Sequence, residues 1–301
     1  MHSPKKNTLL KLFISVLIVF TLSLKLMDHF FLKCNKGFTI WQLYSNHNEY
    51  RDWDAETNTN LPLIEIENIF NQPFTYLGKG HQSIVFESAD RNYVLKLSLL
   101  HSDLRRLGWL KHPLSRITNA RDPIESENKQ TFIATKQSHA FAFSSLKSAS
   151  GILVLHMDKS VNFPFTALLT DPLGHTYSIP LKDTFFLLQR KGTLVFPTIQ
   201  NFLDKKEMGL AKEAIDNLIS FIYFRSLNGI KDDDPVIKKN YGFYGTEAFQ
   251  LDTGKIRQEP MLKNRVSAKE ETIAITKPLE SWLTETSSEL LSHYQNTINR
   301  L

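Results

Sequence analysis

The sequence predicts an α+β protein in which a small antiparallel-sheet lobe and an abridged helical lobe follow an N-terminal hydrophobic helix. Three observations support this fold class. An apolar run lies near the N-terminus, residues 74–99 and 165–188 alternate apolar with polar side chains, and residues 208–227 repeat apolar side chains at three- and four-residue steps. A chain of 301 residues has room for one two-lobed domain or two small domains.

The composition excludes several classes of protein. With 42% hydrophobic and 22% charged residues, the chain has the make-up of a folded globular protein. Its single cysteine, Cys34, excludes an intramolecular disulfide and a cysteine-rich zinc module, and the ten histidines are dispersed without zinc-ligand spacing. The net charge of +5 is a mild excess, and no basic stripe is interleaved with aromatic residues. We therefore expect no nucleic-acid partner.

The first element is a membrane segment within residues 1–36. Residues 8–27 read TLLKLFISVLIVFTLSLKLM, in which Leu12–Leu24 carry no charge and Lys11 and Lys25 are placed to snorkel toward lipid headgroups. Because no small-x-small cleavage signature follows the run, we favour a retained single N-terminal anchor over a cleaved signal peptide. A buried helix of the fold is the remaining alternative. We therefore expect a membrane-associated protein.

The sheet lobe begins with a glycine turn and a hairpin. The alternation of Phe74–Leu99 around the turn Ala89–Asn92 predicts two paired strands. The turn before them carries Gly78 and Gly80, where positive φ and the missing Cβ would let backbone N–H groups approach a phosphate. Taken alone, such a turn is also compatible with a plain hairpin.

Lys96 is the next feature of interest. It lies in the apolar strand Tyr93–Leu97, where an inward-facing ammonium needs an anionic partner. The alternative is an edge-strand lysine that faces water. Residues 165–188 then supply two or three further strands around a turn at Asp171–Gly174, which completes a small antiparallel sheet.

A second constellation follows the amphipathic helix of residues 208–227, which ends at Asn228-Gly229. Three consecutive aspartates, residues 232–234, repel one another and call for a cation. An exposed acidic turn is the alternative interpretation of this run. Asn240 and Asp252 come next. A turn and two short strands are expected between them, and this separation would allow the two side chains to bind one metal ion from opposite sides.

The order of these motifs resembles the protein-kinase-like superfamily over roughly residues 70–260. The glycine turn has the form G-x-G-x-x-S-x-V-F and precedes V-L-K, and the last motif has the form Leu-Asp-x-Gly. The resemblance implies a membrane-anchored phosphotransferase of protein-kinase-like fold that uses ATP and Mg²⁺, with an unknown protein or small-molecule acceptor. The chain is also similar to uncharacterised kinase-like proteins of intracellular bacteria.

The resemblance assigns roles to these residues. The expected nucleotide-binding residues are Gly78, Gly80, Ser83, Val85 and Lys96. The expected catalytic residues are Asp234 as the proton acceptor, Asp232 as its alternate, and Lys96. The neighbouring lysines expected to stabilise charge on the transferred phosphoryl group are Lys238 or Lys239. Asn240 and Asp252 are the expected Mg²⁺ ligands.

Two departures from the family keep other functions open. The segment with helical character at Gln130–Leu155 has no acidic residue to pair with Lys96, although Glu125 and Glu127 lie just upstream. The helical lobe is also short. The alternative function is therefore a catalytically weak or inactive pseudokinase that acts as a nucleotide- or protein-binding scaffold. A membrane-tethered α+β interaction domain is a third hypothesis.

The predicted organisation has four parts. Residues 37–66 show no sustained period, and we interpret them as a connector that packs onto the domain. The parts are a membrane anchor or signal segment at 1–36, the connector at 37–66, a sheet-rich N-lobe at 67–192 and a helical C-lobe at 193–301.

Overall fold

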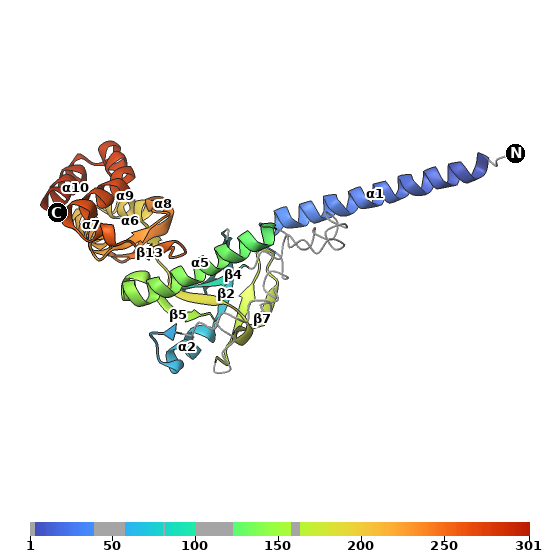
Figure 1. The fold of residues 1–301 in the computed structure, drawn as a ribbon, viewed down its shortest axis with the longest axis horizontal. Helices are drawn as coiled ribbons and strands as arrows, with labels where there is room; N and C mark the ends of the chain where they lie inside the picture. Colours follow the sequence, from blue (N-terminus) through green and yellow to red (C-terminus); the bar gives the residue numbers. More distant parts are fainter. Residues whose placement is uncertain (1–3, 39–57, 81, 100–122, 158–162) are drawn as a thin grey trace.

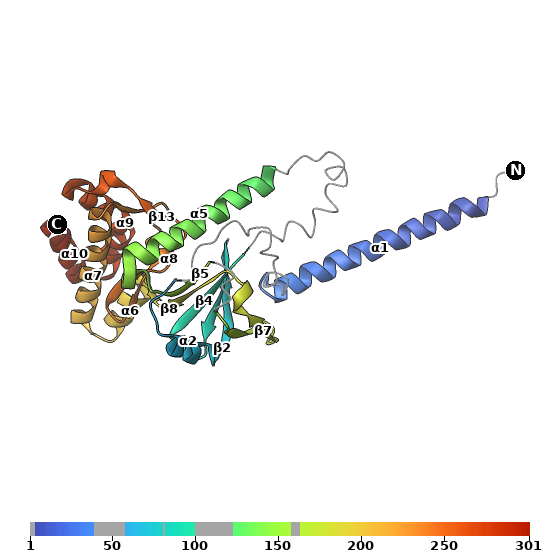
Figure 2. The same ribbon diagram turned by 60° about the horizontal axis from the view of Figure 1, so that its bottom comes forward.

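The computed structural model describes residues 4–38, 58–80, 82–99, 123–157 and 163–301. They form a sheet lobe and a helical lobe, and helix α1 extends away from both (Figure 1 and Figure 2). The predicted α+β class, with its N-terminal apolar helix, sheet lobe and helical lobe, is confirmed.

The helices and strands follow one another in this order. The elements of the first half are α1 Pro4–Cys34, β1 Asn58–Thr59, α2 Leu63–Phe70, β2 Pro73–Lys79, β3 Ser83–Ser88, β4 Tyr93–Ser98, α5 Pro123–Leu146, the 3₁₀ turn η4 Lys147–Ser150, β5 Ile152–His156, β6 Thr166–Thr170, β7 Thr176–Pro180, η5 Leu181–Asp183 and β8 Phe186–Arg190. Those of the second half are β9 Thr193–Leu194, α6 Val195–Asp204, α7 Met208–Leu227, β10 Ile230–Asp232, α8 Ile237–Asn240, β11 Tyr241–Tyr244, β12 Glu247–Gln250, β13 Ile256–Gln258, η6 Pro260–Leu262, α9 Arg265–Thr286 and α10 Ser288–Arg300.

The sheet lobe is built on one sheet of eight strands in the order β1-β5-β8-β4-β3-β2-β6-β7. Its centre is the predicted hairpin, because β3 pairs with both β2 and β4 in antiparallel register. The sheet is larger than the small antiparallel one we expected, and it is mixed, since β2 pairs with β6 in parallel. That pairing is non-local, so alternation within each strand could not reveal it.

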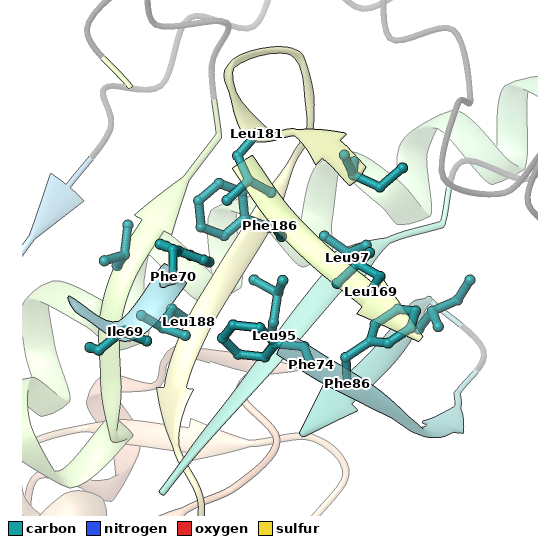
Figure 3. Packing of buried hydrophobic residues seen from close by; sticks show 14 of the residues in the cluster. Ile69, Phe70, Phe74, Phe86, Leu95, Leu97, Leu169, Leu181, Phe186 and Leu188 are labelled. Carbon is teal, nitrogen blue, oxygen red and sulfur yellow. The ribbon is translucent and has the colours of Figure 1, made fainter. Parts of the chain in front are cut away.

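Aromatic side chains fill the core of this lobe. Phe70, Phe74, Phe86 and Phe186 are buried on one face of the sheet (Figure 3). The ring centroids of Phe70 and Phe74 are 5.7 Å apart, and those of Phe70 and Phe186 are 6.1 Å apart, which is the spacing that aromatic pairs favour. Six of the 21 phenylalanines of the sequence are buried in this core.

The chain that leaves α1 enters the same core. Phe38 is fully buried, and its ring lies edge-on to Tyr76 and Phe86 at centroid distances of 5.9 and 6.1 Å. Tyr76 Oη also donates a hydrogen bond of 3.2 Å to the carbonyl of Lys36. The sheet lobe therefore begins directly at the end of α1. The expected connector continues through residues 39–57, which lie outside the described residues.

Helix α5 differs from its predicted extent. It begins at Pro123 and ends at Leu146, and the residues predicted to form its last turns are the 3₁₀ turn η4 and strand β5. Gly151 adopts a φ of 64°, which ends the helical path, and β5 is buried along its whole length. In the sequence, a short and largely apolar strand such as β5 cannot be distinguished from a buried helix segment, because neither shows a polar–apolar period.

The helical lobe is formed by α6 to α10 around α7, whose bounds match the prediction. Gly229 ends this helix with a φ of 73°, and a Cβ there would lie 2.6 Å from Lys263 Cε. Asn264 caps α9 and Ser287 caps α10, each by accepting a hydrogen bond from a backbone N–H of the first turn. The predicted division between residues 192 and 193 falls between β8 and β9 and stays a prediction.

Candidate functional site

A cavity of about 540 Å³ lies where the two lobes meet. The sheet lobe, α5 and the segment between β10 and β13 all contribute to its walls. The residues predicted for the site that line it are Gly80, Ser83, Val85, Lys96, Asp232, Asp234, Lys239, Asn240 and Asp252. Residues from positions more than 150 apart in the sequence are thus brought together in one place.

The glycine turn forms part of the cavity wall. Gly80 N–H donates a 2.8 Å hydrogen bond to the Ser83 carbonyl, which closes the turn. Gly78 does not belong to the lining, and neither glycine has the positive φ that we expected. Neither position is short of space within the protein, because a Cβ at Gly78 would meet no atom within 4 Å and one at Gly80 would meet Ser83 O at 3.7 Å. His81 lies outside the described residues.

Lys96 points inward from β4, between Val85 of β3 and Leu187 of β8. Its Nζ donates a 2.6 Å hydrogen bond to the backbone carbonyl of Leu251, the residue before Asp252. Burial lowers the pKa of Lys96, and the nearby charge of Asp252 opposes that shift. The lysine therefore reaches across from the sheet lobe to the segment that carries Asp252.

Helix α5 contacts the same segment with polar side chains of its own. Ser138 Oγ lies 2.7 Å from the carbonyl of Thr253 and 2.8 Å from that of Ile256. His139 Nδ1 lies 2.7 Å from Thr253 Oγ1. Burial lowers the pKa of His139 to about 4, an effect that Lys96 strengthens and Asp252 opposes, so the ring is neutral at pH 7.

The three consecutive aspartates have three different environments. Asp233 is exposed and forms an ion pair with Arg257, with a distance of 2.6 Å between carboxylate and Nε. Asp234 is about half exposed and lies 3.4 Å from Lys255 Nζ. Asp232 is 2% exposed, next to Arg225 at 3.8 Å. Because each carboxylate faces its own basic side chain, the mutual repulsion anticipated from the sequence is relieved within the protein.

Asp232 belongs to a buried hydrogen-bond network. Its Oδ2 accepts from Tyr241 Oη at 2.9 Å and from Gln250 Nε2 at 2.7 Å. Its Oδ1 accepts from the backbone N–H of Asp234 at 2.9 Å. Burial raises the pKa of Tyr241, so its hydroxyl remains a donor. Both oxygens of Asp232 are therefore already engaged.

Asn240 and Asp252 are the pair predicted to hold a metal ion. Asn240 Nδ2 donates to the carbonyl of Asp234 at 2.5 Å, which leaves its Oδ1 as the atom available to a ligand. Asp252 is exposed to the cavity and accepts from Gly254 N–H at 2.9 Å. One carboxylate and one amide oxygen fit Mg²⁺, which takes few protein ligands and completes its shell with water and phosphate oxygens.

Two lysines near Asp234 differ from each other. Lys239 lines the cavity, whereas Lys238 Nζ lies 5.7 Å from the centre of the Phe196 ring. Of the two candidates for stabilising transferred charge, Lys239 is the one that the structure brings to the site. Lys255, which the sequence did not single out, also lines the cavity next to Asp234.

The sequence also missed the contribution of α5. Thr131, Thr135 and His139 line the cavity, and Ser138 holds the segment behind it. The signal was present as helical spacing, since residues 131, 135, 138 and 139 lie on one face of a helix. The glutamate that the family places in this helix has no equivalent in the described lining. The side chains of Glu125 and Glu127 lie outside the described residues.

No protein-family model matches the chain, and no curated protein matches it. Among solved structures, it is similar to the bifunctional kinase-methyltransferase WbdD, with 14% identity and a TM-score of 0.33. The matched region covers 72% of this chain but only 43% of WbdD.

Two further structures are similar at the same level. One is Rv3197 of Mycobacterium tuberculosis, solved with erythromycin, with 13% identity over 86% of this chain and 68% of that one, at a TM-score of 0.29. The other is the ROP18 kinase domain with AMP-PNP and sucrose, with 12% identity over 79% and 82% of the two chains, at a TM-score of 0.35. Likeness at this level carries no conclusion about the chemistry of the site.

Proposed function

We propose that this protein is a membrane-anchored, kinase-like phosphotransferase that uses ATP and Mg²⁺. The observation that carries the proposal is the meeting of Lys96, Asp234, Asn240 and Asp252 around one cavity between the lobes, with the glycine turn in its wall. A lysine from a sheet, a carboxylate with an asparagine beside it, and a second carboxylate before a glycine are the parts that phosphoryl transfer needs.

Each residue has a role that follows from its place. Lys96 would neutralise phosphate charge from the sheet side, and the turn around Gly80 would lie over the phosphates. Asn240 and Asp252 would hold Mg²⁺, which when bound neutralises charge shared between the β- and γ-phosphates. Asp234, half exposed in the cavity, would orient the acceptor hydroxyl.

The chemical step would then follow. The acceptor oxygen bonds to the γ-phosphorus, the bond between that phosphorus and the β–γ bridging oxygen breaks, and ADP leaves. The hydroxyl proton passes to Asp234, whose carboxylate faces the cavity. Asp232 is a poor choice for this task because it is buried and both of its oxygens accept hydrogen bonds within the protein.

Helix α1 supports the membrane part of the proposal. Leu10–Phe31 has a mean hydropathy of 2.1, is long enough to cross a bilayer, and has no buried residue in its apolar window. Phe38 packs into the sheet lobe only a few residues later. A retained anchor would therefore keep the catalytic domain close to the membrane surface, within reach of an acceptor that is itself at the membrane.

Nucleotide-dependent stabilisation of the full chain in detergent tests the proposal. ATP at about one hundred times its Kd should raise the melting temperature by about 5–10 °C, and only when Mg²⁺ is present. Asp252→Ala should lose the response, and Asp233→Ala should keep it, because Asp233 pairs with Arg257 and does not line the cavity. Absence of any ATP- or GTP-dependent shift in the wild-type chain would refute the proposal.

A second candidate function is a pseudokinase that binds nucleotide as a scaffold. One observation favours it: Lys96 donates to the Leu251 carbonyl, and no carboxylate of α5 in the described lining pairs with it. Release of radiolabelled phosphate from ATP that disappears in Asp252→Ala would exclude the pseudokinase. ATP-dependent stabilisation without any such turnover would support it.

A further inference from the structure

We propose that Asp232 is a positioning residue, which fixes the two cavity carboxylates Asp234 and Asp252 relative to each other through a buried network. The inference rests on the proposed function and deepens it, because it names the part of the protein that keeps the site in order. The network consists of Arg225 of α7, Asp232 of β10, Tyr241 of β11 and Gln250 of β12.

Two hydrogen bonds connect the network to the site. The backbone N–H of Asp234 donates to Asp232 Oδ1 at 2.9 Å. Gln250 Nε2 donates both to Asp232 Oδ2 at 2.7 Å and to the backbone carbonyl of Asp252 at 2.9 Å. A single carboxylate thus restrains the backbone at Asp234 directly and, through one amide, the backbone at Asp252.

Arg225 of α7 is the fourth member of the network and contacts the other three. Its NH1 donates to Tyr241 Oη at 2.6 Å and to Gln250 Oε1 at 3.0 Å, and it lies 3.8 Å from Asp232 Oδ2. These two contacts leave Tyr241 and Gln250 with their donors directed at Asp232. The orientation of the Gln250 amide is therefore fixed, and with it the bond to the Asp252 carbonyl.

The network is a costly way to stabilise a fold. The Arg225 side chain is fully buried, and its Nε and NH2 have no hydrogen-bond partner among the described residues. A buried ion pair adds little net stability, because desolvation of both charges offsets their attraction. A fully buried polar network does, however, hold its members in one arrangement. Positioning of the two carboxylates explains its presence better than stability does.

Two substitutions break the network at different points. Tyr241→Phe removes one donor to Asp232 and keeps the ring in place. Gln250→Met removes the amide that joins Asp232 to the Asp252 carbonyl. Tyr294→Phe is the matched control. Tyr294 is also a buried tyrosine, and its hydroxyl forms a 2.8 Å hydrogen bond with Thr276 where α10 packs on α9. It does not line the cavity.

The expected result is a split between turnover and nucleotide binding. With the full chain in detergent, kcat should fall about tenfold in Tyr241→Phe and about 100-fold in Gln250→Met, while KM for ATP changes less than threefold. The Mg²⁺ concentration needed for half-maximal rate should rise in Gln250→Met, because Asp252 is no longer held. Tyr294→Phe should match wild type in all three.

Hydrogen exchange provides a readout that does not depend on turnover. Exchange should increase in the peptides over residues 232–236 and 250–256 together in both network variants, and in neither peptide in Tyr294→Phe. Unchanged exchange and unchanged kcat in Gln250→Met would overturn the inference. A wild-type chain without nucleotide-dependent stabilisation would instead refute the proposed function, and joint opening of the two peptides would still identify the network.

Discussion

The two walls of the cavity hold their polar groups in different ways. On the helical-lobe wall, Asp232 ties the segments of Asp234 and Asp252 together through buried side chains that come from four elements. On the sheet-lobe wall, the described hydrogen-bond partner of Lys96 is one backbone carbonyl. Helix α5 adds hydroxyls, the neutral His139 and the buried Lys136, whose Nζ donates a 2.9 Å hydrogen bond to the Met157 carbonyl.

The difference indicates where the precision of the site lies. Groups restrained by several side chains lose less entropy when a ligand binds, and they hold their geometry within the fraction of an ångström that catalysis requires. We therefore expect the helical-lobe wall to be the more rigid part of the site. Substitutions on the two walls should differ in size accordingly, which makes the comparison testable.

Asp234→Asn should have the largest effect on the helical-lobe wall. It removes the proton acceptor and keeps the size of the side chain, so kcat for phosphoryl transfer should fall about 1,000-fold with little change in melting temperature. Steady-state assays with radiolabelled ATP measure this. Asp233→Asn is the neighbouring control, because Asp233 is exposed and paired with Arg257 outside the cavity lining. If kcat fell equally in both variants, Asp234 would not be the proton acceptor.

Lys96→Met should have a smaller effect, from the sheet-lobe wall. The substitution keeps the buried apolar stem and removes the charge, so kcat/KM for ATP should fall about 100-fold. Lys191→Met is the control, since Lys191 forms an ion pair with Glu87 and does not line the cavity. If Lys96→Met lowered the rate more than Asp234→Asn, the sheet-lobe wall would contribute more to catalysis than the helical-lobe wall, the opposite of what we expect.

Ser138→Ala tests the contact between α5 and the segment after Asp252. Ser138 is 6% exposed. Its Oγ accepts a hydrogen bond from the Ile256 N–H and has one proton to donate to the Thr253 or the Ile256 carbonyl, so its loss leaves buried backbone groups unsatisfied. The free energy of unfolding should fall by about 2 kcal/mol. Urea titration measures the change, with Ser144→Ala as the control, because Ser144 lies on the same helix and is exposed. A loss no greater than the control's would show that α5 is held by apolar packing alone.

Much of the fold could be predicted from local patterns in the sequence. Helix α7 has the bounds that its apolar spacing predicts, and the strands on either side of Ala89–Asn92 pair as expected. The parallel pairing of β2 with β6 and the placement of β5 between β1 and β8 could not be predicted, because they depend on contacts between distant segments. The same reason explains why the helix predicted to reach Leu155 ends at Leu146.

The candidate site divides in the same way. Motif order and the resemblance that it carries singled out Lys96, Asn240 and Asp252, and the structure brings all three to one cavity. Spacing alone favoured Asp234 over Asp232 as the proton acceptor, whereas the buried environment of Asp232 and its hydrogen-bond partners could not be predicted from the sequence. His139 was missed because the motif required an acidic residue in its helix, and a neutral imidazole carries out the contact with Thr253 instead.

The smallest expected effect is a pH dependence from His139 on the sheet-lobe wall. The pKa of His139 falls to about 4 in the folded chain, below the ordinary value of 6.5. Between these two pH values the imidazole is protonated in the unfolded chain and neutral in the folded chain. Stability should therefore decrease as the pH falls from 6.5 toward 4, by about 1–2 kcal/mol at pH 5 relative to pH 7. Urea titrations of wild type and His139→Gln at the two pH values isolate this group, because the contributions of the other titrating residues cancel in the difference. The variant should lose less stability than wild type on acidification. Equal losses would mean that His139 takes up its proton without leaving its place beside Thr253, and that this wall tolerates a second positive charge near Lys96.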